Sequence, residues 1–271
     1  MREKVNGFVG VMAVAILCMV SGLCMVWGIA PVVLAVYVAA CAVCGRYMIT
    51  CIGCAAGVAA GSMGIAGLLH AYEYMIPGPV YSGVMVTEKY LVLLGLAMCL
   101  MKIVYSRNSR SYVRVIVVMS AAVLMGNIVV YADNMLMAAA YGVVEAAIFM
   151  CASVILKPGI GLLYTYICGD ASDVERDESW NISQGIVSLM ALAAVVLWVV
   201  PGEDIYGVNP AFMLALVLIL YAVYRTGAVY GCGMAAVAGS IVSVKLNDSR
   251  WLMWMLLVTP VSYTHLTLPT N

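Results

Sequence analysis

MAAAYGVVEAAIFMCASVIL, residues 137–156, is a run of twenty residues in which Glu145 is the only charged side chain. An α-helix rises about 1.5 Å per residue, so about twenty residues cross the roughly 30 Å hydrocarbon core of a bilayer. The apolar residues are continuous and do not alternate, which favours a helix over a strand. A helix also satisfies its own backbone polar groups where water is absent. This stretch therefore predicts a transmembrane helix.

The rest of the chain has the same character. Of its 271 residues, 65% are hydrophobic and 10% are charged, with a mean hydropathy of +1.07, whereas soluble domains contain about 25% charged residues. The formal net charge is zero, so no basic excess indicates a nucleic-acid partner. We predict an all-α, polytopic bundle of about ten spans whose partner is the lipid bilayer.

The expected spans are 7–26, 28–44, 47–69, 90–104, 113–132, 135–156, 185–200, 209–224 and 226–244, followed by the start of a tenth at Trp251. With a cytoplasmic N-terminus, ten cationic residues fall inside and only Lys89, Lys245 and Arg250 fall outside. This bias is the one that the positive-inside rule predicts.

The C-terminal segment ends the predicted membrane domain, residues 1–261. The apolar run WLMWMLLVTPV, 251–261, has eleven residues and is too short to cross a core of about 30 Å. The last ten residues, 262–271, resemble a translated sequencing-library adapter, which predicts a non-native tail. We therefore expect a gene fragment that stops inside its tenth span.

Glu145 is the main candidate for a functional site. An ionisable residue inside a span is costly and by default suggests an ion or proton pathway. Because no second charge is evident in the spans, we favour a hydrogen-bonding or helix-packing role for a buried, protonated Glu145, with Asn127 or a tyrosine hydroxyl such as that of Tyr141 as its partner. On this hypothesis Glu145→Gln preserves assembly and Glu145→Leu does not.

Small residues recur every four positions in two spans, which places them on one helix face. They let helix backbones approach closely in lipid, and the alternative is a substrate path between helices. The residues of these helix-packing stripes are Gly53, Gly57 and Gly61 in the third span, and Gly227, Gly231, Ala235 and Gly239 in the ninth.

CAVCGRYMITCIGC, residues 41–54, places Cys41, Cys44, Cys51 and Cys54 across a short predicted turn. Two facing Cys pairs could form a tetrahedral thiolate site. Cysteine also packs as a small hydrophobe, and we favour this explanation, so metal binding by these residues stays an open alternative and no metal site is assigned.

Other polar groups fit solvated surfaces better than sites. The predicted cytoplasmic loop 157–184 carries Asp173, Glu175, Asp177 and Glu178, which could hold a divalent cation, although a solvated loop or partner surface is favoured. His70 beside Glu73 fits an interfacial position. The chain contains no P-loop, G-x-S-x-G or H-E-x-x-H motif, so we assign no catalytic residue and no cofactor-binding residue.

The order of features resembles the N-terminal membrane domain of stage II sporulation protein E of endospore-forming Firmicutes. The features are GIAP before the second span, VVEAAIFMCASVIL (143–156) in the sixth, a charged loop after it, and GAVYGCGMAAVAG (227–239) in the ninth. The resemblance covers roughly residues 10–255.

This resemblance implies a membrane anchor at the asymmetric septum. It is followed by a cytoplasmic region that self-associates and contacts the division protein FtsZ, and then by a manganese-dependent PP2C-type protein serine phosphatase. That hydrolase acts on a phosphorylated anti-anti-sigma factor and so activates the forespore sigma factor. Both later regions lie outside this sequence. The alternative function is a small-molecule or ion transporter domain, which predicts several inward-facing polar residues.

Overall fold

The computed structural model describes residues 2–23, 31–72, 83–104, 109–132, 134–168, 182–200 and 209–267. Nearly all of these residues are helical, in ten helices. They are α1 (Arg2–Gly22), α2 (Pro31–Cys44), α3 (Tyr47–Tyr72), α4 (Gly83–Val104), α5 (Ser109–Val130), α6 (Met135–Cys168), α7 (Ile182–Val199), α8 (Pro210–Thr226), α9 (Ala228–Leu246) and α10 (Arg250–Thr267). This arrangement confirms the all-α fold class.

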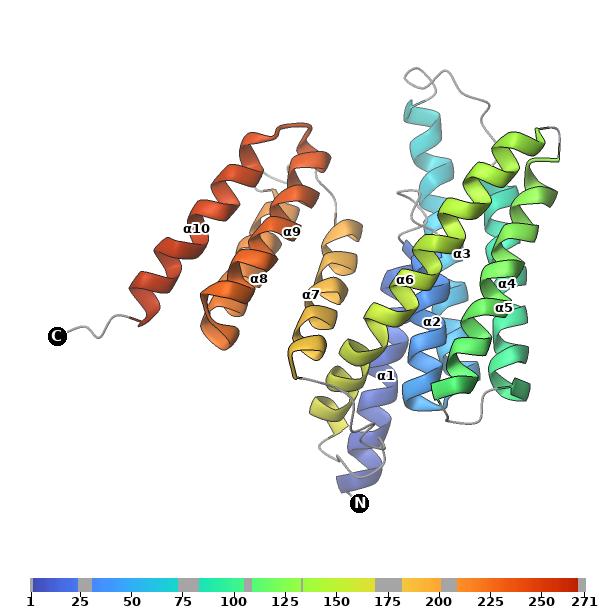
Figure 1. Ribbon diagram of the computed structural model, residues 1–271, viewed down its shortest axis with the longest axis horizontal. Helices are drawn as coiled ribbons and strands as arrows, with labels where there is room; N and C mark the ends of the chain where they lie inside the picture. The colour runs from blue at the N-terminus through green and yellow to red at the C-terminus, as the bar shows by residue number, and fades with distance from the viewer. Residues whose placement is uncertain are drawn as a thin grey trace. The chain divides into compact units, whose positions relative to one another are not determined.

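The chain divides into two units, Met1–Leu189 and Met190–Asn271. In the first unit α2 is the central helix, because it packs against α1, α3, α4 and α6 and all its residues from Pro31 to Cys41 are buried. A helix that is apolar on every side can be accommodated only inside such a cluster. Helices α4, α5 and α6 lie side by side (Figure 1), and α5 packs against both of the others.

The second unit packs α9 against α8 and α10. Asn209 caps α8 by accepting a hydrogen bond from the backbone N–H of Phe212 at 3.0 Å, with Pro210 in the first helical turn, where its missing N–H costs nothing. The core of this unit is aliphatic and consists of Leu197, Ala211, Ala215, Ile219, Val223, Met234, Ala235, Ala238, Ile241, Val242 and Met255.

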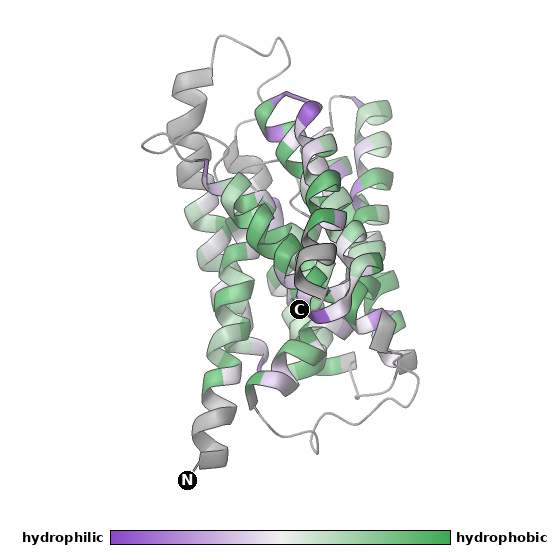
Figure 2. Cartoon of the chain, turned by 90° about the vertical axis from the view of Figure 1, so that its left-hand side faces the viewer, coloured by the Kyte–Doolittle hydropathy of each residue, from purple (hydrophilic) through white to green (hydrophobic). Residues whose placement is uncertain are grey.

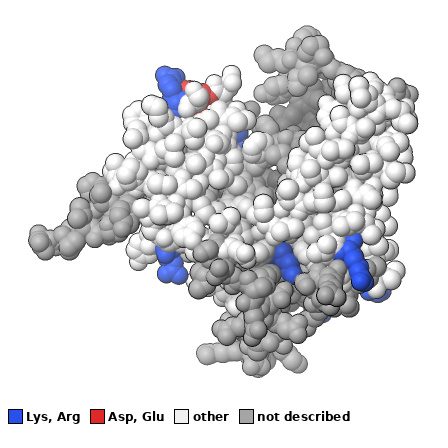
Figure 3. Space-filling model, in the orientation of Figure 1, with Lys and Arg blue, Asp and Glu red and all other residues white. Residues whose placement is uncertain are grey.

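Within the described residues, three helical segments are long and apolar enough to cross a membrane: Ser111–Val130, Met135–Ile167 and Ala228–Leu246. Figure 2 shows the most hydrophobic residues along the middle of the helices and hydrophilic residues gathered toward helix ends and connections. On the face drawn in Figure 3, uncharged side chains cover most of the described surface, and the few Lys, Arg, Asp and Glu residues lie mostly toward its upper and lower margins.

Three helix boundaries differ by six residues or more from those expected. Helix α4 begins at Gly83 and not at 90, so it contains Lys89. Helix α6 continues past the expected end at 156 to Cys168, with Pro158 inside it. Because Pro158 removes only one backbone donor and residues 159–168 are almost entirely apolar, the helix continues where a polar loop was predicted. Helix α10 ends at Thr267, six residues into the segment predicted to be non-native.

Candidate functional site

Glu145 forms a largely buried ion pair with Lys89, a residue that the sequence pattern places outside the membrane. Lys89 Nζ lies 2.7 Å from Glu145 Oε2, and the exposed fractions of the two side chains are 4% and 19%. Glu145 comes from α6 and Lys89 from α4. The pair therefore joins α4 to α6 through two residues that are 56 positions apart in the sequence.

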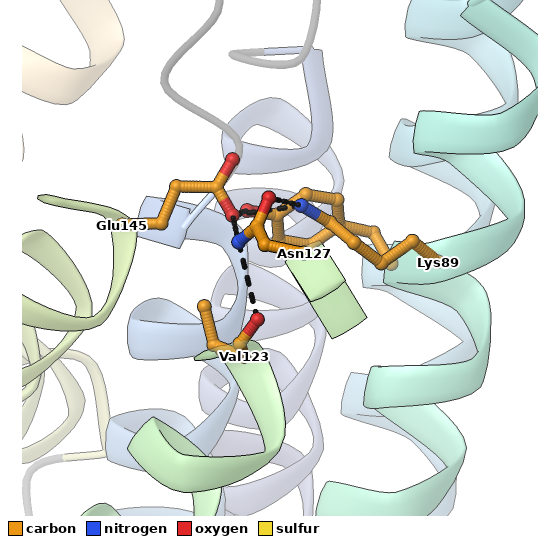
Figure 4. A network of polar contacts seen from close by, with 5 residues as sticks. Lys89, Val123, Asn127 and Glu145 are labelled. Atoms are coloured by element: carbon orange, nitrogen blue, oxygen red, sulfur yellow. Dashed lines mark hydrogen bonds and ion pairs between the residues drawn. The ribbon is translucent and has the colours of Figure 1, made fainter. Parts of the chain in front are cut away.

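Asn127 of α5 connects the two charged groups. Its side-chain oxygen accepts a hydrogen bond from Lys89 at 3.1 Å, while its amide nitrogen donates to Glu145 Oε2 at 2.7 Å. The same nitrogen donates to the backbone carbonyl of Val123 at 3.1 Å, one turn earlier in α5 (Figure 4). The bond to Val123 fixes the orientation of the amide, so its oxygen faces the cation and its nitrogen faces the carboxylate.

Tyr90 completes this polar network, which consists of Lys89, Tyr90, Asn127 and Glu145. Its hydroxyl donates to Glu145 Oε2 at 3.0 Å, and its ring centroid lies 4.7 Å from Lys89 Nζ. Three donors thus converge on one carboxylate oxygen, and the other oxygen points away from the network (Figure 4). Charge-assisted hydrogen bonds of this kind are about twice as strong as neutral ones.

Two glycines make room for the network. A Cβ at Gly126 of α5 would lie 3.3 Å from both Cγ and Cδ of Lys89, so the lysine stem passes directly over this position. A Cβ at Gly142 of α6 would lie 3.4 Å from the Cα of Leu124 and 3.5 Å from the Cβ of Asn127. Small residues at these two positions allow α4, α5 and α6 to approach closely enough for the ion pair to form.

The network corrects two sequence-based expectations about Glu145. One partner is a cation, Lys89, whereas no second charge was expected within the spans. Of the expected neutral partners, Asn127 bonds to Glu145, and the tyrosine hydroxyl that bonds to it is that of Tyr90. Tyr141 is half-exposed and stacks on Tyr131 with ring centroids 5.2 Å apart. The apolar stretch Gly83–Val86 could have revealed that Lys89 lies within a helix. It extends the apolar pattern of the fourth helix toward the N-terminus, past Glu88 and Lys89.

A second polar contact joins α5 and α6 nearer the other end of α5. The hydroxyl of Tyr112 donates to the backbone carbonyl of Ser153 at 2.7 Å, and Lys157 Nζ lies 4.6 Å from the centroid of the Tyr112 ring. A cation within about 6 Å of an aromatic face is attracted to it. The α5–α6 hairpin is therefore held at two separate points.

The four cysteines of the predicted hairpin are divided by the structure. Cys41 and Cys54 are buried, and Cys44 and Cys51 are half-buried. The Cys41 sulfur contacts the Thr50 hydroxyl at 3.2 Å. In the described part of the chain, no group of three or more His, Cys, Asp or Glu residues is placed to hold a metal ion.

The stripe of small residues on α3 lies at the contact between α3 and α1. A Cβ at Gly53 would lie 2.7 Å from the carbonyl oxygen of Ala15, and one at Gly57 would lie 2.9 Å from the Cα of Gly22, both on α1. Gly61 is buried further along α3. Gly22 is the facing small residue that the sequence stripe did not include.

In the second unit, Gly231 and Gly239 face neighbouring helices. A Cβ would lie 3.3 Å from the Thr259 side chain at Gly231 and 3.1 Å from the Cα of Leu252 at Gly239. Gly227 differs from the expectation, because it lies between α8 and α9 with φ of 86° and an added Cβ would meet nothing within 4 Å. Its role is the turn that ends α8, since a positive φ favours glycine, and it does not pack against another helix.

Several predicted polar groups fall outside the described residues. They include Glu73 and the acidic residues Asp173, Glu175, Asp177 and Glu178. His70 lies in α3, but its side chain is not among those described.

No known protein family, curated protein or solved structure matches the chain.

Proposed function

We propose that this chain is the membrane anchoring and localisation domain of a sporulation protein serine phosphatase that acts at the asymmetric septum. The proposal rests on the sequence resemblance around VVEAAIFMCASVIL and GAVYGCGMAAVAG. On this proposal about ten spans start from a cytoplasmic N-terminus. The catalytic, manganese-binding, FtsZ-binding and anti-anti-sigma-factor-binding residues belong to regions beyond this sequence.

The observation that best supports an anchoring role is the closed form of the polar network. Lys89, Tyr90 and Asn127 direct their polar groups at one another or at Glu145. A substrate site would instead leave several polar groups converging on a cavity. A network that joins α4, α5 and α6 suits a rigid bundle that holds soluble regions at a membrane.

The first experiment is a localisation assay. Residues 1–261 fused to a fluorescent protein are expressed in a sporulating, endospore-forming bacterium, with an unrelated polytopic protein as the control. We expect the fusion to concentrate at the polar septum while the control labels the whole membrane. Uniform labelling by both proteins would refute the localisation role.

The second experiment reads the genomic sequence downstream of Pro260. The proposal requires that the native frame continue into a soluble region of several hundred residues, as the resemblance implies. A stop codon directly after the tenth apolar segment would exclude the phosphatase anchor.

The second candidate function is an ion or small-molecule transporter, and the depth of the ion pair favours it. Glu145 is the eleventh residue of α6, about 15 Å from the start of the helix, and lies inside the segment Met135–Ile167 that is apolar enough to cross a membrane. Ionisable residues at this depth commonly mark ion or proton pathways. Uptake into liposomes by the purified chain, abolished by Glu145→Gln, would support this alternative.

A further inference from the structure

The ammonium group of Lys89 occupies a site built from three kinds of cation-binding group. Its nitrogen lies 2.7 Å from Glu145 Oε2, 3.1 Å from the side-chain oxygen of Asn127 and 4.7 Å from the ring centroid of Tyr90. A carboxylate, an amide oxygen and an aromatic face all attract a primary ammonium, which has three N–H donors to share among them.

The acceptors are held in place by bonds that do not involve Lys89. Asn127 is oriented by its bonds to the Val123 carbonyl and to Glu145, at 3.1 and 2.7 Å. The Tyr90 hydroxyl bonds to Glu145 at 3.0 Å. Removing the lysine amine would therefore leave the carboxylate oxygen and the amide oxygen aligned.

We propose that Glu145, Asn127 and Tyr90 form a binding site for a primary alkylammonium ion, and that Lys89 fills this site in the native chain. Helix α4 thus carries both the ligand and the aromatic face of Tyr90, while α5 and α6 carry the oxygen acceptors. When α4 packs against α5 and α6, its Lys89 ammonium binds to this site as a ligand that is covalently attached to the chain. This inference is independent of the proposed function in sporulation.

The shape of the site defines a suitable external ligand. Lys89→Ala removes three methylenes and the ammonium, which together correspond to n-propylammonium. The space opened in this way lies over Gly126, where a Cβ would be 3.3 Å from Cγ and Cδ of the lysine. Only 4% of the Lys89 side chain is exposed, so a bound cation would be largely shielded from its surroundings.

The test is chemical rescue of the full chain carrying Lys89→Ala, purified in detergent. A ligand that binds only the folded state raises stability with its concentration. We expect n-propylammonium to raise the Tm of this variant along a saturating curve. Tetramethylammonium, which has the same charge but no N–H donor, should give no such rise.

Two matched variants identify the site. Lys89→Met retains a long apolar stem over Gly126 and should not respond to n-propylammonium. Lys89→Ala combined with Glu145→Gln removes the carboxylate and should also lose the response. Equal responses of Lys89→Ala and Lys89→Met, or equal effects of the two cations, would overturn the proposal.

The rescue can also be measured if Lys89→Ala does not remain folded during purification. Membranes are then extracted with either cation present, and the yield of monodisperse protein is compared by size-exclusion chromatography. The proposal requires recovery with n-propylammonium and none with tetramethylammonium. Recovery with neither cation would refute it.

Discussion

Removing one charge of the Lys89–Glu145 pair should destabilise the bundle far more than removing both. The nitrogen–oxygen distance is 2.7 Å, and the Lys89 and Glu145 side chains are 4% and 19% exposed, so Lys89→Met leaves a largely buried carboxylate without its cation. Breaking a buried ion pair in this way costs about 3–5 kcal/mol. Glu145→Gln leaves the buried ammonium without its counter-ion, and we expect a cost in the same range.

The double variant Lys89→Met with Glu145→Gln removes both charges but keeps an acceptor for Asn127 and Tyr90. Its cost should be limited to the two hydrogen bonds that Lys89 donates, each worth about 0.5–1.5 kcal/mol. The double variant is therefore expected to be more stable than either single variant. The coupling energy of this cycle should be about 3 kcal/mol or more, at or above the upper end of the usual range for contacting residues.

The assay is equilibrium unfolding in mixed micelles, followed by far-UV circular dichroism, for the wild type, both single variants and the double variant. Additive effects of the two substitutions would show that the ion pair does not couple α4 to α6. Tolerance of Glu145→Gln alone would favour the protonated carboxyl that was expected from the sequence.

Three further substitutions test the packing of α3 against α1, the hydrogen bond between Tyr112 and Ser153, and the C-terminal end of α9. Gly57→Ala should lower the free energy of unfolding by about 1–3 kcal/mol, because the added Cβ meets the α1 backbone. In the control Gly95→Ala the added Cβ meets nothing within 4 Å, and this variant should not have a lower Tm. Tyr112→Phe removes the buried bond to the Ser153 carbonyl and should cost about 1 kcal/mol, measured as a fall in Tm; an unchanged Tm would show that this bond does not stabilise the hairpin. Asn247 ends α9 with φ of 50°, so replacement by Ala should cost about 1 kcal/mol while replacement by Gly is tolerated, and equal Tm values for the two variants would contradict this reason.

The helical class and two members of the network could be predicted from sequence, because continuous apolar runs and isolated polar residues within them are local signals. Glu145 and Asn127 were identified in this way. Lys89 was missed because its partner is 56 residues away, and local composition around Glu88 and Lys89 resembles a membrane boundary. A buried lysine is favourable only when its counter-ion is present, and this information is carried by the tertiary structure.

Prediction of helix packing from glycine spacing has a similar limit. A four-residue repeat identifies a helix face only as long as the helix continues. The ninth-span repeat begins at Gly227, where α8 has ended and α9 has not yet begun. Spacing alone does not distinguish a glycine required by positive φ from one required by close packing, and Gly227 and Gly231 are an example of each.

The two polar contacts between α5 and α6 set the rotational phase of one helix against the other. One contact joins Asn127 to Glu145, and the other joins Tyr112 to the Ser153 carbonyl. Each residue inserted into an α-helix turns everything beyond it by about 100°. An insertion between Glu145 and Ser153 would therefore break one contact whenever the other formed. The number of residues between these two positions is thus constrained. Most side chains between them could still be exchanged for other apolar ones.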